Sequence, residues 1–180
     1  MAELEEPGGA LSTTGSEDLA LSLATDAGAR EAMRNAFHEA PLHKLLGLHI
    51  TDLGPDGVTV EMPVRESAFN STGNLHGGSL ATLIDVAAGT AAAIGSGFQP
   101  GRETIVTADL HVRYLGRPKG DIVRAVARVL KAGRQLVVVE CQVTDDEDRI
   151  IAVSDFSSMI VPLRQPLRPM PTAEHKHPDI

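Results

Sequence analysis

The chain has 180 residues, of which 42% are hydrophobic, and a formal net charge of −8. Six of its acidic side chains lie within residues 1–26, where there is no Lys or Arg, so the remainder carries a net charge of only about −2. A nearly neutral body gives no support for nucleic-acid binding, and the length suits one domain with a sizeable core. No uninterrupted apolar run is long enough to span a membrane, and a single cysteine, Cys141, excludes an internal disulfide. Because the acidic start also differs from a signal peptide, we expect a cytoplasmic protein.

The first third of the chain predicts a tail, a helix and a hairpin. Residues 1–26 combine Gly, Ser, Thr and acids without periodicity, which predicts a flexible tail before the domain. Residues 27–40 have helical spacing, and Pro41 is expected to end that helix. Two strands are predicted over residues 45–53 and 58–64, because a Gly-Pro-Asp-Gly turn separates two apolar runs.

The middle of the chain holds its most informative stretch, a polar loop followed by a long apolar helix. The loop covers residues 65–75, and the helix runs from Gly78 to Ile94 before two glycines end it. Asp85 is the one charged residue of this helix and lies near its middle. A carboxylate on a buried helix costs free energy unless it is paired, hydrogen-bonded or protonated. That cost makes Asp85 the main candidate for chemistry.

Side-chain size divides the same helix into two faces. The bulky face is predicted to pack on a sheet and comprises Leu80, Leu83, Ala87 and Ile94. The face of Asp85 is small enough to admit a ligand or a second helix and comprises Gly78, Ala81, Thr82, Ala88, Gly89 and Ala92.

The start of the helix is the second candidate region. The backbone N–H groups of Gly77 and Gly78 lack intrahelical partners there, and the helix dipole is positive, so this end can hold a developing oxyanion. Gly77 and Asp85 are about 12 Å apart along the helix axis. One small reacting group cannot touch both, so a site that uses both residues requires two copies of the chain.

Four further strands are predicted after the helix, over residues 104–115, 121–131, 134–144 and 149–161. Cys141 alternates with valines on the apolar side of one of them, which predicts a buried, inert thiol. The proline-rich residues 163–180 predict an extended tail after a domain that covers residues 27–162. A hairpin, a long apolar helix and four strands predict an α+β fold in which one antiparallel sheet wraps around one helix.

The loop and the helix together carry a resemblance to a known family. Asn70, the run Gly73-Asn-Leu-His-Gly-Gly78 and Asp85 resemble the motif of hotdog-fold thioesterases of the phenylacetate-degradation (PaaI) type. The resemblance extends over residues 40–162 with a matching order of elements. It implies a hotdog fold, hydrolysis of acyl-CoA thioesters without metal or bound cofactor, and active sites at a homodimer interface, with a homotetramer as a further option.

The resemblance also implies roles for individual residues. Asp85 would act as the general base that activates water or as the nucleophile on the acyl carbon, and the Gly77 N–H would bind the thioester oxygen. Asn70 would orient the carbonyl group or the water, and His76 would support the loop. For Asn70 the alternative is a residue that caps a turn, and for His76 it is a purely structural contact.

Thr107 is the family position for a hydroxyl that holds the attacking water. In a regular strand, however, Thr107 shares its side with polar residues such as Asp109 and His111. The opposite side is apolar and comprises Val106, Ala108, Leu110 and Val112. Whether Thr107 faces the helix or the solvent therefore stays open.

Substrate contacts are predicted from both ends of the motif. Gly78, Ala81 and Thr82 would line the site, and Lys131 and Arg134, which match the basic turn of the family, would bind the phosphates of coenzyme A or remain solvated surface charges. The histidines of the domain form no ligand pattern, so no metal site is predicted.

The alternative function is a non-catalytic acyl-CoA-binding or sensor protein on the same fold, and a hotdog dehydratase matches the motif less well. The sequence does not identify the acyl group.

Overall fold

The computed structural model describes residues 26–54 and 57–163. The tails expected at 1–26 and 163–180 lie outside the described residues apart from one residue each, as does the middle of the hairpin turn. Asp26 caps the first described helix, because its Oδ1 accepts a hydrogen bond of 2.7 Å from the Gly28 N–H. Leu163 N–H donates to the Arg102 carbonyl at 2.8 Å, so the chain is still paired where the last strand ends.

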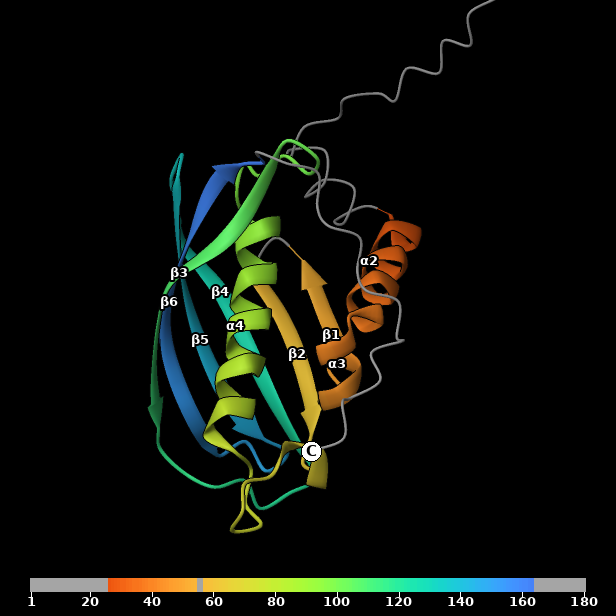
Figure 1. Cartoon of the computed structure of the whole chain (residues 1–180), viewed down its shortest axis with the longest axis vertical. Helices are drawn as coiled ribbons and strands as arrows, with labels where there is room; N and C mark the ends of the chain where they lie inside the picture. Colours follow the sequence, from red (N-terminus) through yellow and green to blue (C-terminus); the bar gives the residue numbers. More distant parts are fainter. Residues whose placement is uncertain (1–25, 55–56, 164–180) are drawn as a thin grey trace, which may run out of the picture.

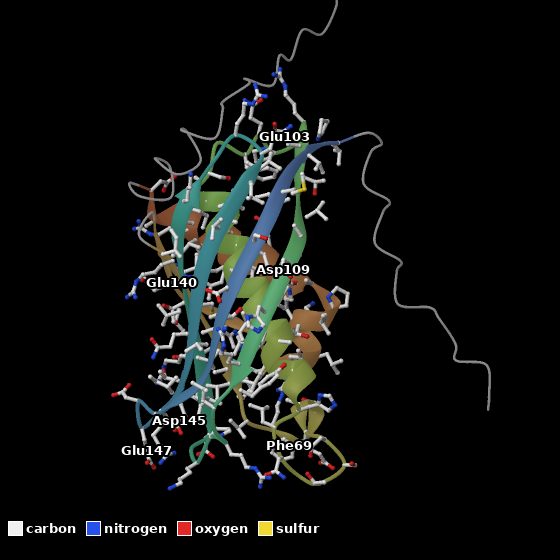
Figure 2. All side chains as sticks on the ribbon, turned by 90° about the vertical axis from the view of Figure 1, so that its left-hand side faces the viewer. Phe69, Glu103, Asp109, Glu140, Asp145 and Glu147 are labelled. Atoms are coloured by element: carbon white, nitrogen blue, oxygen red, sulfur yellow. The ribbon has the colours of Figure 1, made fainter. Side chains whose placement is uncertain are left out.

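One antiparallel sheet of six strands forms the body of the molecule (Figure 1). In spatial order the strands are β1 (His49–Gly54), β2 (Gly57–Pro63), β4 (Ile122–Ala132), β5 (Leu136–Asp145), β6 (Ile150–Pro162) and β3 (Glu103–Tyr114). Every neighbouring pair is antiparallel, and β1 and β3 form the two edges. Figure 2 shows the outer face of this sheet, with Asp109 on the edge strand β3 and Glu140 on β5. The strands predicted after the helix are confirmed, with ends that differ by one or two residues.

The long helix α4 (Gly77–Ile94) lies along the concave face of the sheet (Figure 1) and contacts β2, β3, β4, β5 and β6. By length and composition α4 could cross a membrane, but it serves here as the core helix of the sheet. Its buried residues are Leu80, Leu83, Ile84, Ala87, Ala88, Ala91, Ala92 and Ile94. The α+β hotdog fold, with one sheet wrapped around a central helix, is therefore confirmed.

The rotation of α4 on the sheet differs from the prediction. Ala88 and Ala92 were expected beside Asp85 on an open face, but both are fully buried against the sheet. The half-exposed stripe instead includes Val86 and Gly89, and Asp85 lies at its border. Side-chain size alone could not fix this rotation, because alanine packs under a sheet as readily as it leaves room for a ligand.

The segment before the hairpin is also corrected. The strand predicted over residues 45–53 is confirmed from His49 onward as β1, but its first two residues belong to the short helix α3 (Pro41–Leu46), which follows α2 (Ala27–Glu39). Pro41 ends α2 as expected and also occupies the first position of α3, where its missing N–H costs nothing. Gly47, with a φ of 69°, ends α3 in the left-handed conformation before β1 begins.

Candidate active site

A direct hydrogen bond joins the central helix to the edge strand. Thr107 Oγ1 on β3 donates to Oδ1 of Asp85 on α4 at 2.8 Å. The other carboxylate oxygen of Asp85, Oδ2, has no hydrogen-bond partner among the described residues, so it is free to accept a proton from a bound molecule. The pair therefore combines a fixed carboxylate orientation with one open acceptor.

A β-bulge explains why Thr107 faces the helix. The pairing of β3 with β6 shifts its register between Thr107 and Asp109, so Ala108 is the extra residue. Before the bulge Ile105 and Thr107 point inward, and after it the inward set is Leu110 and Val112. The apolar face expected from strict alternation is therefore wrong for the first half of the strand, where the Val106 side chain is exposed. The bulge lets one strand present a hydroxyl to the site and apolar side chains to the core.

A hollow of about 340 Å³ opens over the half-exposed stripe of α4. Its lining residues come from α2, α3, α4 and β3 and are Met33, His43, Asp85, Val86, Gly89, Thr90, Ala93, Ile105 and Thr107. Asp85 and His43 are the two ionisable residues in this lining. The Nδ1 of His43 lies 2.7 Å from the carbonyl oxygen of Phe37, an acceptor, so this nitrogen carries the proton. The remaining wall is apolar or small, which suits an uncharged acyl group.

The N-terminus of α4 offers one free backbone donor. His76 caps the helix, because its Nδ1 accepts a hydrogen bond of 2.7 Å from the Gly78 N–H. The N–H groups of the next two residues donate to the His76 carbonyl. The Gly77 N–H has no partner within the described part of the chain, so it is the donor left for a ligand.

Tyr114 on β3 fastens the start of α4 to the sheet. It is the only tyrosine of the chain, and no role was predicted for it from the sequence. Its hydroxyl donates to the Gly77 carbonyl at 2.9 Å. A Cβ built on Gly77 would lie 3.4 Å from the Cζ of Tyr114, so the ring packs directly against the glycine. The signal available in the sequence was its position at the end of the same predicted strand, seven residues after Thr107.

The side chain of Asn70 organises the loop before α4. Its Oδ1 accepts hydrogen bonds from the Thr72 N–H at 3.0 Å, the Thr72 hydroxyl at 2.8 Å and the Asn74 N–H at 3.1 Å. Three donors saturate this oxygen, while the Asn70 Nδ2 has no partner among residues 26–54 and 57–163. The geometry thus supports the turn-capping alternative for the oxygen and leaves the amide NH₂ free to act on a ligand.

The structure does not bring the remaining candidates to the hollow. Lys131 and Arg134 are exposed at the turn between β4 and β5, and neither forms an ion pair within the described residues. The turn lies near the C-terminal end of α4, since a Cβ on Gly95 would come within 2.8 Å of Val129 Cγ2. Ala81 and Thr82 are half-buried on α4, and the Thr82 hydroxyl bonds to the Gly78 carbonyl at 2.9 Å.

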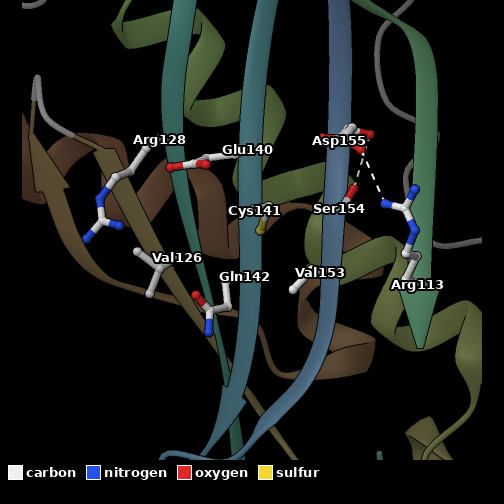
Figure 3. Close-up of a pocket in the computed structure, with 9 residues that line it drawn as sticks. All are labelled: Arg113, Val126, Arg128, Glu140, Cys141, Gln142, Val153, Ser154 and Asp155. Atoms are coloured by element: carbon white, nitrogen blue, oxygen red, sulfur yellow. Dashed lines mark hydrogen bonds and ion pairs between the residues drawn. The ribbon is translucent and has the colours of Figure 1, made fainter. Parts of the chain in front are cut away.

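A second hollow, of about 200 Å³, lies on the outer face of the sheet (Figure 3). Arg113 and Asp155 form an ion pair of 3.5 Å at its rim, and Arg128 and Glu140 face each other across β4 and β5. Burial raises the pKa of the nearby Cys141 thiol to about 12, so this cysteine stays protonated at neutral pH. The prediction that this thiol is buried is confirmed.

Comparison with known proteins places these features in a family. Residues 72–152 match the sequence profile described as the thioesterase superfamily. Human acyl-coenzyme A thioesterase 13 is 30% identical over 118 residues, which cover 64% of this chain and 81% of that protein. The 1,4-dihydroxy-2-naphthoyl-CoA hydrolase of Listeria monocytogenes is 25% identical over 113 residues, or 63% and 89% of the two chains. A solved thioesterase from Haemophilus influenzae superposes with a TM-score of 0.68 at 22% identity, covering 77% of this chain and 94% of its own, which supports the fold.

Proposed function

The chain belongs to the thioesterase superfamily, and from this premise we propose that this thioester hydrolase cleaves acyl-CoA to a free acid and coenzyme A. The observation that carries the proposal is the Asp85–Thr107 pair at the border of an apolar hollow. Two of the relatives described above are named for CoA thioester hydrolysis, which supports an acyl-CoA substrate.

In the proposed mechanism Asp85 supplies the base. Its free Oδ2 takes a proton from a water molecule, which attacks the thioester carbonyl carbon, while Thr107 holds Oδ1 in place. The negative charge that develops on the carbonyl oxygen is stabilised by the Gly77 N–H at the positive end of α4. The thiolate of coenzyme A is a good leaving group, so these three groups suffice without a metal ion or bound cofactor. Direct attack by Asp85 on the carbonyl carbon is the alternative chemistry for the same carboxylate.

The same mechanism calls for a homodimer. Gly77 and Asp85 are separated by about 12 Å on one helix, so the donor and the base that act on one carbonyl come from two copies of α4. The exposed edge strand β3 and the open hollow provide a surface that a second copy would cover. In such a dimer the free Asn70 NH₂ would orient the carbonyl, and Lys131 and Arg134 would bind the phosphates of coenzyme A. A mass measurement in solution would distinguish a dimer from a tetramer.

The test is thiol release from a panel of phenylacetyl-, benzoyl-, hexanoyl- and palmitoyl-CoA by the wild type and Asp85→Asn. We expect the variant to lose roughly 100- to 10,000-fold in kcat, the usual contribution of a general base. Asp109→Asn, a change at an exposed aspartate on the same edge strand, is the matched control and should retain activity. Full activity of Asp85→Asn would refute the mechanism. Acyl-CoA binding by calorimetry without any turnover would instead support a non-catalytic acyl-CoA-binding or sensor protein.

A further inference from the structure

Ser158 carries a buried hydroxyl for which the mechanism above has no use. It lies on β6, its side chain is completely buried, and its Oγ has no hydrogen-bond partner among the described residues. The other hydroxyl in this state belongs to Ser96, just beyond the end of α4. A buried hydroxyl without a partner costs free energy, so an apolar residue would be the better choice at a purely structural position. The inward-facing neighbours of Ser158 on β6, Phe156 and Ile160, are indeed apolar.

The register of the sheet places Ser158 beside the proposed base. Ser158 is the direct partner of Thr107 across the β3–β6 pairing, one position before the bulge. Both side chains point inward, since Thr107 bonds to Asp85 on α4 and Ser158 has no exposed surface. Directly opposed residues on one face of an antiparallel pair have Cβ atoms about 4.5–5.5 Å apart, a spacing at which Ser and Thr hydroxyls form hydrogen bonds.

In a hydrogen bond between these two hydroxyls, Ser158 must be the donor and Thr107 the acceptor. The Thr107 hydroxyl has one proton, and it donates that proton to the Asp85 carboxylate. Its oxygen retains lone pairs that can accept a hydrogen bond from Ser158. A chain of hydrogen bonds polarises its members, so a donor on the Thr107 oxygen strengthens the bond from Thr107 to Asp85.

In the structure Ser158 Oγ makes no hydrogen bond to Thr107, although the two residues are paired across β3 and β6. We propose that Ser158 is a positioning residue of this site: a rotation of its side chain about χ1 lets its hydroxyl donate to Thr107 Oγ1, which fixes the rotamer of Thr107 and the orientation of the Asp85 carboxylate. The inference rests on the proposed function, because it assigns Ser158 a part in the reaction that Asp85 carries out. Ser158 acts through Thr107 and does not touch the substrate.

The experiment is a double-mutant cycle on kcat with the acyl-CoA that the wild type hydrolyses best. Ser158→Ala should lower kcat by roughly three- to tenfold, the worth of one hydrogen bond, with KM changed by less than about twofold. In the Thr107→Val background the same change should have no further effect, because the acceptor is gone. Ser154→Ala is the matched control, since Ser154 is also buried on the inner side of β6 but its hydroxyl donates to the Asp155 carbonyl at 3.2 Å (Figure 3).

The same cycle on thermal unfolding midpoints gives a readout that needs no turnover. If the bond exists, Ser158→Ala lowers the midpoint when Thr107 is present and does not lower it in the Thr107→Val background. A rise in both backgrounds would show that the hydroxyl has no partner and would overturn the proposal.

The kinetic outcomes separate this proposal from the proposed function. The role of Ser158 would be overturned if Ser158→Ala kept the wild-type kcat, or if it lowered kcat equally in the Thr107 and Thr107→Val backgrounds. In either case a loss of activity in Asp85→Asn would still support the mechanism. Absence of turnover in the wild type would overturn both the mechanism and the positioning role.

Discussion

The hydroxyl of Thr107 donates a hydrogen bond of 2.8 Å to Oδ1 of Asp85, which joins two residues 22 positions apart on the edge strand and the central helix. Asp85 has no cationic partner in this structure, so the hydroxyl is the one group that selects its orientation among the described residues. The bond leaves Oδ2 without a partner among the described residues, and Asp85 itself lines the hollow. Loss of Thr107 should therefore affect the reaction more than the fold.

Thr107→Val keeps the shape of the side chain but removes the donor. We expect kcat to fall by about 10- to 100-fold, because a hydrogen bond to a charged group is worth about 1.5–3 kcal/mol. Thr107→Ser retains the hydroxyl and should keep most of the activity. Steady-state kinetics of the two variants check this, and equal losses would mean that the methyl group rather than the hydroxyl matters.

The sequence predicted the order of the elements and the position of Asp85, but not the bulge that brings Thr107 to it. Strict alternation grouped Thr107 with the polar side of the strand, and one extra residue at Ala108 reverses that grouping. A bulge depends on the pairing with β6, which lies more than 40 residues along the chain, so no local pattern reports it. The fold was predictable because it rests on apolar periodicity, whereas the site depends on register and on the rotation of α4.

The short helix α3 was missed for a related reason. The apolar residues Leu45, Leu46 and Leu48 form a run too short for periodicity to separate a helix from a strand. The proline at the first helical position and the glycine after the last one were the better signals, since they mark the two ends of a helix. His43, which lines the hollow, is placed by this helix and was therefore also missed.

Tyr114→Phe tests whether the sheet positions the proposed oxyanion donor. The change removes the 2.9 Å hydrogen bond to the Gly77 carbonyl and keeps the ring that packs on the glycine. Because the first turn of α4 would be held less firmly, we expect kcat to fall by about three- to tenfold with little change in KM. Tyr114→Leu, which also removes the ring, should lower kcat further. An unchanged kcat in Tyr114→Phe would show that the helix start needs no support from β3.

Gly89 should set the space available to the acyl group. It lies one helical turn after Asp85 in the lining of the hollow, and a Cβ built there meets no described atom within 4 Å. Gly89→Leu would fill part of the hollow, so we expect kcat/KM for palmitoyl-CoA to fall at least about tenfold relative to hexanoyl-CoA. Gly89→Ala is the control, which should stabilise the helix by about 0.5–1 kcal/mol and leave the chain-length preference nearly unchanged. Parallel losses for both substrates in Gly89→Leu would place the acyl group elsewhere.

Asp145 should make the fold sensitive to acid. Its carboxylate is completely buried at the end of β5 and accepts hydrogen bonds from the Arg149 guanidinium and from three backbone N–H groups. Burial by itself raises the pKa of Asp145, but the hydrogen bonds from Arg149, Lys119 and Glu147 outweigh it and lower the pKa to about 2. The folded pKa thus lies below the unfolded value of about 3.9.

The sign of the effect follows from this difference. A group whose pKa is lower in the folded state contributes stability above its unfolded pKa, and that contribution is lost as the pH falls from about 4 through about 2. Asp145→Asn should therefore be less stable than the wild type at pH 7, and the gap should shrink below pH 4. Urea unfolding midpoints of both proteins between pH 2.5 and 7 measure this, with the exposed Asp155→Asn as a control that should follow the wild type. A gap that stays constant over this range would show that the carboxylate of Asp145 gains nothing from its hydrogen bonds in the folded state.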